Sequence, residues 1–63
     1  SSFRDEARKA RVERAMHLLA TTDMKLSAVA LEVGFQKLQN LNEAFEAATL
    51  VPPREWRKRH RAP

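Results

Sequence analysis

Hydrophobic residues recur along the chain at the spacing that places them on one side of a helix. The first stripe consists of Val12, Ala15, Met16 and Leu19, and the second of Leu26, Val29, Ala30 and Val33. In both stripes the residues follow an i, i+3, i+4, i+7 pattern, which is typical of an amphipathic α-helix. The pattern therefore predicts helices over residues 3–20 and 26–33.

A third amphipathic segment follows over residues 37–48. At 100° per residue, one side collects Leu38, Leu41, Ala44, Phe45 and Ala48. The opposite side is rich in amides and carries Gln36, Gln39, Asn40, Glu43, Glu46 and Ala47, with Asn42 on the flank. Such a face fits an ordinary solvated surface, and it equally fits a surface that offers paired hydrogen-bond donors and acceptors.

Helix-breaking residues stand at the expected boundaries. Gly34, the only glycine, directly follows the second helix, where a residue in the left-handed conformation commonly ends a helix. Pro53 suits the first position of a fourth helix over residues 53–60, which Trp56 is expected to anchor to the core. No alternating run of β-branched and aromatic residues indicates a strand, so the predicted fold class is all-α.

Composition narrows the class of protein. The 63 residues are 43% hydrophobic and 32% charged and include no cysteine, which excludes a disulfide framework and a cysteine-based zinc site. No hydrophobic run approaches the roughly 18 residues that a membrane span needs, and a cytoplasmic setting fits the chain. So short a chain has a marginal core and little room for a catalytic cleft.

The net charge of +4 is unevenly distributed. Residues 1–20 carry +2, residues 21–50 carry −2, and residues 51–63 carry +4, with the densest basic block at 54–61. Taken alone, this block fits a solvated surface as well as it fits contact with nucleic acid.

The second and third helices, joined through Ala30 and Gly34, describe a helix-turn-helix. We expect the homeodomain-like three-helix type with an added short C-terminal helix. The predicted organisation is a connecting helix over 1–22, a helix-turn-helix over 23–50, and a basic helix and tail over 51–63. Together, residues 1–63 are expected to form a single domain.

At this point the sequence resembles a known family, the AraC/XylS family of bacterial transcription regulators. The resemblance rests on Arg11-Val12-x-x-Ala15-x-x-Leu18-Leu19, Ala28-Val29-Ala30-x-x-Val33-Gly34-Phe35, Leu41-x-x-x-Phe45 and Pro53-x-x-Trp56-Arg57. It implies sequence-specific binding to double-stranded DNA by the second of two helix-turn-helix units. It also implies that a first unit and an effector-binding domain belong to the full-length protein, so that residues 1–63 would be a single partial domain.

The resemblance also implies roles for individual residues. The third helix would enter the major groove, with Leu38, Gln39, Asn42 and Glu43 facing bases, because amides bond adenine and leucine contacts the thymine methyl group. Phosphate contacts would come from the start of the second helix and from basic side chains. These phosphate-contacting residues are Lys25, Ser27, Lys37, Arg54 and Arg57.

Some residues depart from the family pattern. Lys25 replaces a common capping serine, which leaves Ser27 as a candidate cap, and Leu50 stands where a glycine usually follows the third helix. Leu41 and Pro52 replace a usual phenylalanine and serine. Glu43 replaces a frequent basic residue, and residues 37–48 carry a net charge of −1, which weakens direct readout by this helix.

Catalytic and metal chemistry receive no support from the sequence. His17 has no carboxylate or second histidine at i+3 or i+4, and His60 lies in the basic tail, so these two distant groups do not form a metal site. We expect no enzyme activity and no cofactor. The alternative function is a protein-interaction or dimerisation module, in which Glu43 and Glu46 meet a basic partner such as RNA polymerase or another regulator chain.

Overall fold

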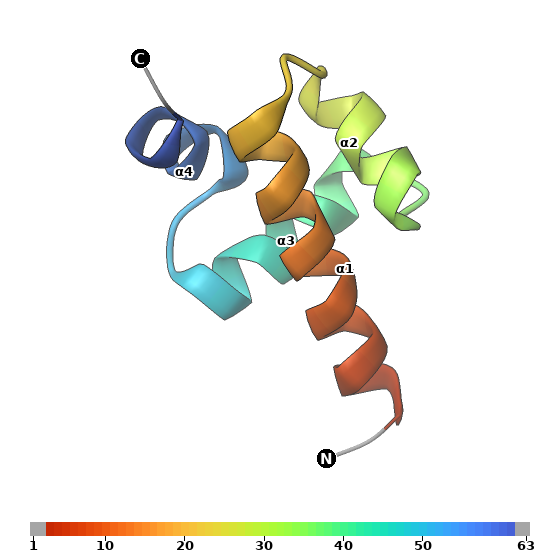
Figure 1. Ribbon diagram of the computed structural model, residues 1–63. Coiled ribbons are helices and arrows are strands. Elements are labelled where there is room, and N and C mark those ends of the chain that lie inside the picture. Colours follow the sequence, from red (N-terminus) through yellow and green to blue (C-terminus); the bar gives the residue numbers. More distant parts are fainter. Residues whose placement is uncertain (1–2, 62–63) are drawn as a thin grey trace.

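The computed structural model describes residues 3–61, and this part of the chain folds into four helices with no strand. They are α1 (Phe3–Thr21), α2 (Leu26–Val33), α3 (Leu38–Thr49) and α4 (Pro53–His60). Helix α1 runs along the middle of the molecule, with the other helices gathered around its C-terminal half (Figure 1). The all-α fold is confirmed, and each predicted helix boundary lies within one residue of the observed one.

The third helix differs slightly from its predicted range. It begins at Leu38 rather than residue 37, because Lys37 has extended backbone angles of φ −137° and ψ 149° and stands before the helix. It also continues one residue further than predicted, to Thr49.

The core lies where α1, α2 and α3 meet. Its buried hydrophobic residues are Val12, Ala15, Leu19, Val29, Ala30, Val33, Leu41, Ala44 and Phe45. Each of the three predicted hydrophobic faces contributes to it. Ala48 lies on the hydrophobic side of α3 but is exposed, because it lines an open hollow between α1 and α3 instead of the buried contact at Ala44.

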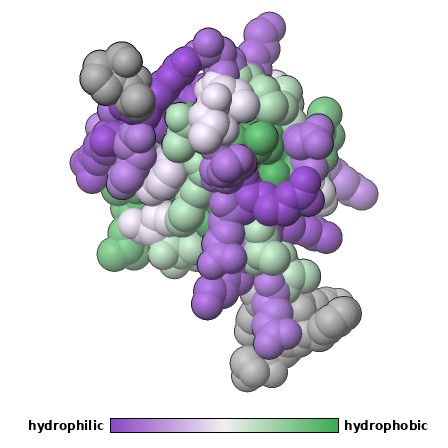
Figure 2. All heavy atoms as spheres, in the orientation of Figure 1, coloured by the Kyte–Doolittle hydropathy of each residue, from purple (hydrophilic) through white to green (hydrophobic). Residues whose placement is uncertain are grey.

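The N-terminal half of α1 projects beyond the core. Side chains 6–11 are all exposed, and among residues 6–21 of this helix Val12 is the first that is buried. The molecule is correspondingly elongated, with principal extents of 37 × 20 × 17 Å. In the space-filling view, hydrophilic side chains alternate with hydrophobic ones across the face shown (Figure 2).

The turn after α2 has the glycine geometry that the sequence predicts. Gly34 adopts φ 110°, and its N–H donates to the carbonyl oxygen of Leu31 at 3.2 Å. The Phe35 N–H donates to the carbonyl oxygen of Ala30 at 2.8 Å, which completes a Schellman motif. A Cβ added at Gly34 would lie 3.1 Å from Nε of Arg11, so the turn is also closely packed.

The turn after α3 reaches a similar conformation without a glycine. Leu50 has φ 68° and a side chain that is 87% exposed. Its N–H donates to the carbonyl oxygen of Glu46 at 2.8 Å. An L-residue with a side chain is strained in the left-handed region, and here burial of the leucine side chain does not offset the strain.

Candidate nucleic-acid interface

The residues that were predicted to face bases all lie on α3, and one of them, Leu38, also packs against the hydrophobic core. Gln39 and Glu43 are exposed, whereas Leu38 and Asn42 are half-buried. The Nε2 atom of Gln39 donates to Oε2 of Glu43 at 3.5 Å, one helical turn away. The polar ends of these two exposed side chains therefore engage each other along the helix surface.

A groove of about 350 Å³ lies where the start of α2, the side of α3 and the start of α4 meet. It is lined by Leu26, Leu38, Asn42, Glu46, Pro52, Pro53 and Arg54. The structure thus brings two predicted base-facing residues, Leu38 and Asn42, beside one predicted phosphate contact, Arg54. Glu46, which was not among the predicted site residues, lines the same groove.

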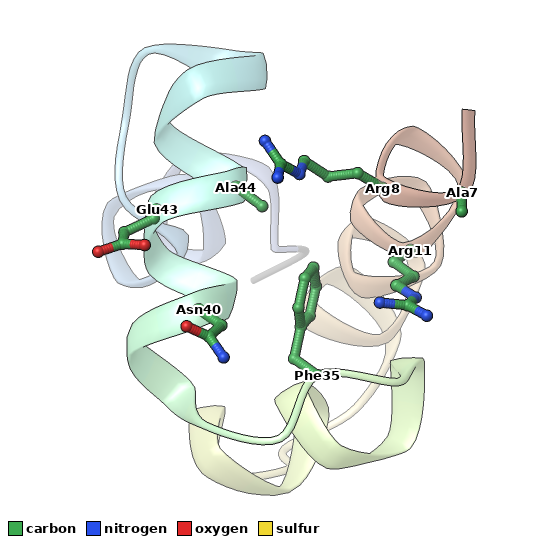
Figure 3. A pocket seen from close by; sticks show the side chains of 7 residues that line it. All are labelled: Ala7, Arg8, Arg11, Phe35, Asn40, Glu43 and Ala44. Atoms are coloured by element: carbon green, nitrogen blue, oxygen red, sulfur yellow. The ribbon is translucent and has the colours of Figure 1, made fainter. Parts of the chain in front are cut away.

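A second groove, of about 450 Å³, separates the projecting part of α1 from α3. Its lining comprises Ala7, Arg8, Arg11, Phe35, Asn40, Glu43 and Ala44 (Figure 3). Arg8 extends from α1 toward α3, whereas the carboxylate of Glu43 points away from α1 (Figure 3). Glu43 therefore borders this groove but directs its charge outward, onto the free face of α3.

Arg11 was not among the predicted site residues, and it has a structural contact in this second groove. Its guanidinium carbon lies 5.6 Å from the centroid of the Phe35 ring, in a cation–π arrangement. This contact fixes the turn between α2 and α3 against α1. Spacing alone gives no sign of it, because the two residues are far apart in the sequence.

Helices α2, α3 and α4 all begin without a side-chain cap. Lys25, Lys37 and Pro52 occupy the positions before them in extended conformations, and none makes a capping side-chain bond. The expected cap at Ser27 is not seen, because Ser27 lies inside α2 with its side chain exposed. In α2 the first helical bond runs from the Val29 N–H to the Lys25 carbonyl oxygen, at 2.9 Å. The preceding N–H groups remain available to an anion.

The predicted phosphate-contacting residues differ in their surroundings. Lys25, Ser27, Lys37 and Arg54 are exposed. Arg57 is half-buried, and its Nε and Nη2 atoms donate to the carbonyl oxygens of Leu19 and Met24 at 3.3 and 2.7 Å. The sequence pattern singled out Arg57 as a phosphate contact, but it gave no sign of these two acceptors.

Helix α4 carries an aromatic pair along its own surface and an ion pair to the connection that precedes α2. Trp56 is half-buried, and its indole ring stacks on His60 with centroids 4.2 Å apart and planes 16° from parallel. Arg61 at the end of this helix forms an exposed ion pair with Asp23. The ion pair links the end of the basic helix to the connection between α1 and α2.

Among residues 3–61, no group of three His, Asp or Glu side chains is placed to hold a metal ion. Within the same range, no helix is long and apolar enough to cross a membrane.

Comparison with known proteins adds two similarities. A family model described as a helix-turn-helix domain matches residues 1–59. The fold is similar to a crystal structure of the C-terminal domain of the two-component response regulator yesN from Fusobacterium nucleatum subsp. nucleatum ATCC 25586, with a TM-score of 0.87 and 30% identity. That match covers 90% of this chain and 55% of the other, so the chain spans about half the length of that structure. None of the curated proteins matches.

Proposed function

The chain belongs to the AraC-type helix-turn-helix family of DNA-binding transcription regulators, and on this premise we propose that α3 enters the major groove of double-stranded DNA and reads its sequence. The similar solved structure is the C-terminal domain of a response regulator. We extend the proposal to a longer regulator that carries a further helix-turn-helix unit and an effector-binding domain and acts on the chromosome in the cytoplasm.

The groove between α2, α3 and α4 is the observation that carries this proposal. The side of α3 that bears Leu38 and Asn42 lies between the open start of α2 and the start of α4 with Arg54. A helix flanked by two groups that attract phosphates is the arrangement by which a helix-turn-helix reaches base edges. Phosphate contacts on both sides would fix the depth and register of α3.

Base readout in this arrangement is divided between apolar and amide groups. Leu38 would contact a thymine methyl group, and the amides of Gln39 and Asn42 would bond adenine. Glu43 would accept a hydrogen bond from cytosine N4, provided that Gln39 releases it on binding. The phosphates would be contacted by Lys25, Lys37 and Arg54 side chains and by backbone N–H groups at Ser27.

A salt titration tests the proposal directly. Binding of the chain to a mixed-sequence duplex of about 20 base pairs, roughly two helical turns, is followed by fluorescence anisotropy. Three cationic contacts predict a slope of log K against log [salt] of about −2.7, since each neutralised phosphate contributes about −0.9. A slope near zero would contradict DNA binding by this surface.

The exposed carboxylates on α3 favour a second candidate function. Glu43 and Glu46 are both exposed, and this helix carries no compensating basic residue between Leu38 and Thr49. Such a face would suit a basic protein surface, for example on RNA polymerase or on another regulator chain. Analytical ultracentrifugation of the chain with and without DNA separates the two functions, because a monomer that binds DNA supports the first.

A further inference from the structure

Arg57 makes the longest-range hydrogen bonds from a side chain among the described residues, joining α4 to segments 38 and 33 positions earlier. One edge of its guanidinium faces two backbone carbonyl oxygens, with Nε on Leu19 and Nη2 on Met24. A planar guanidinium can serve two acceptors along one edge, whereas an ammonium group presents a single point charge.

The two acceptors belong to the segment that leads into α2. Leu19 lies in the last turn of α1, where carbonyl groups lack helical partners, and Met24 lies in the connection before α2. Thr22 braces the same connection, since its Oγ1 donates to the Leu18 carbonyl oxygen at 2.7 Å and accepts from the Met24 N–H at 3.2 Å. Arg57 therefore joins this hydrogen-bond network from α4 and contacts the connection before α2.

This connection sets the distance between two of the proposed phosphate contacts. Lys25 directly follows Met24 and stands at the start of α2, whereas Arg54 lies one turn before Arg57 in α4. The starts of both helices line the groove beside α3. A bond from Arg57 to Met24 thus ties the start of α2 to α4 and holds Lys25 and Arg54 at a fixed separation.

We propose that Arg57 is a positioning residue that sets the spacing of the two phosphate-contacting helix starts, and that it is not itself a phosphate ligand. The inference rests on the proposed DNA-binding function. If Arg57 turned outward to a phosphate, the carbonyl oxygens of Leu19 and Met24 would lose charge-assisted hydrogen bonds in a part-buried site. Arg54, which is exposed, bears no such cost.

The wild-type chain provides the first test. In the free protein, the Nε–H resonance of Arg57 is expected to be observable and slow to exchange with water, because Nε donates to Leu19. Addition of the mixed-sequence duplex is expected to leave this resonance unshifted. A rapidly exchanging signal in the free protein, or a shift that saturates with DNA, would overturn the proposal.

Variants provide the second test, with Arg54 as a matched control on the same helix. We expect Arg57→Gln and Arg57→Lys each to raise the exchange rates of the Met24 and Val29 amides about tenfold in the free protein, while the Phe45 amide stays unchanged. Both variants are expected to bind the duplex about tenfold more weakly than wild type. Their slopes of log K against log [salt] are expected to stay within about 0.3 of the wild-type slope. Arg54→Gln is expected to reduce the slope by about 0.9, and Arg54→Lys to restore it.

A phosphate ligand would behave in the opposite way at position 57. Rescue of binding by Arg57→Lys, together with a slope reduced by about 0.9 in Arg57→Gln, would overturn the positioning role. Unchanged Met24 and Val29 exchange in both variants would also overturn it. If the wild-type chain binds no duplex, the proposed function fails, while the exchange rates still decide whether Arg57 holds the start of α2. If either variant fails to fold, the wild-type Nε–H measurement decides.

Discussion

The indole of Trp56 meets the ring of Phe45 edge-on, with centroids 5.8 Å apart and planes at 77°. Phe45 is completely buried in the core, so this contact joins α4 directly to the core. Edge-to-face aromatic pairs contribute about 0.5–1.5 kcal/mol beyond the surface they bury.

Replacement of this indole tests how far the fold depends on α4. Trp56→Ala is expected to lower the free energy of unfolding by about 3 kcal/mol, because it leaves a cavity against Phe45 and removes the aromatic pair. Trp56→Phe keeps an aromatic edge and is expected to cost about half as much. Urea denaturation followed by circular dichroism measures both. An alanine variant as stable as the phenylalanine variant would contradict the anchoring role.

Leu50 offers a route to a more stable chain. Leu50→Gly is expected to raise the free energy of unfolding by about 0.5–1 kcal/mol, because glycine adopts φ 68° without steric cost and the leucine side chain is exposed. Leu50→Ala is the matched control and is expected to leave stability nearly unchanged, since alanine retains the strain. Thermal unfolding by calorimetry compares the three chains, and equal gains from glycine and alanine would refute the strain argument.

Gly34 is predicted to be intolerant of any side chain. Gly34→Ala is expected to destabilise the chain by about 1–3 kcal/mol, because φ 110° is unfavourable for alanine. The new Cβ would also lie close to Arg11. In the background of Arg11→Ala this contact disappears while the backbone strain remains. A double-mutant cycle measured by chemical denaturation therefore divides the loss of stability between backbone strain and the contact with Arg11. If Gly34→Ala no longer destabilises a chain that carries Arg11→Ala, the contact and not the backbone strain is the cause.

The exposed carboxylate of Glu46 on α3 is expected to oppose DNA binding in general. Glu46→Gln should tighten binding to all duplexes by a few-fold, because Glu46 lines the groove with Arg54 and repels phosphates. Glu55→Gln, in the first turn of α4, is a control that removes a carboxylate outside this groove. Anisotropy titrations at low salt provide the comparison. Weaker binding by Glu46→Gln would instead indicate that this carboxylate contacts a base or orders Arg54.

Base readout and phosphate contact are expected to be carried by two different side chains, those of Gln39 and Arg54. Gln39→Ala should change the preferred base at one position of a selected site, by about 1–3 kcal/mol in discrimination, with the salt slope unchanged. Arg54→Ala should weaken binding to every sequence alike. Selection from a randomised duplex library measures the first effect, and anisotropy measures the second. Similar behaviour of both variants would contradict the proposed division.

The helices were predictable because their signals are local. The periodicity before Gly34 and the proline at Pro53 depend on backbone geometry that neighbouring residues determine. The exposure of Ala48 was not predictable, since it depends on where α1 crosses α3. Periodicity identifies the hydrophobic side of a helix but not how much of its length another helix covers.

In the candidate site, too, some features follow from the local sequence and others depend on how the helices pack. The exposure of Gln39 and the half-burial of Asn42 follow from their positions around α3. The carbonyl partners of Arg57 do not follow from any spacing, because they lie 38 and 33 residues away and form only when α4 docks. A family pattern marks such a residue without revealing what it binds.

The projecting half of α1 has a consequence for motion. Side chains 6–10 are exposed and precede the contact of Arg11 with Phe35, so these turns lack much of the tertiary packing that sustains most short helices in water. They are expected to exchange between helix and coil within about a microsecond, while the turns from Val12 to Leu19 stay fixed by the core. Backbone order parameters should then fall along one helix, from about 0.85 near Leu19 to below about 0.6 near Ala7. The single continuous helix α1 would thus combine a rigid C-terminal half with an N-terminal half that unfolds and refolds locally.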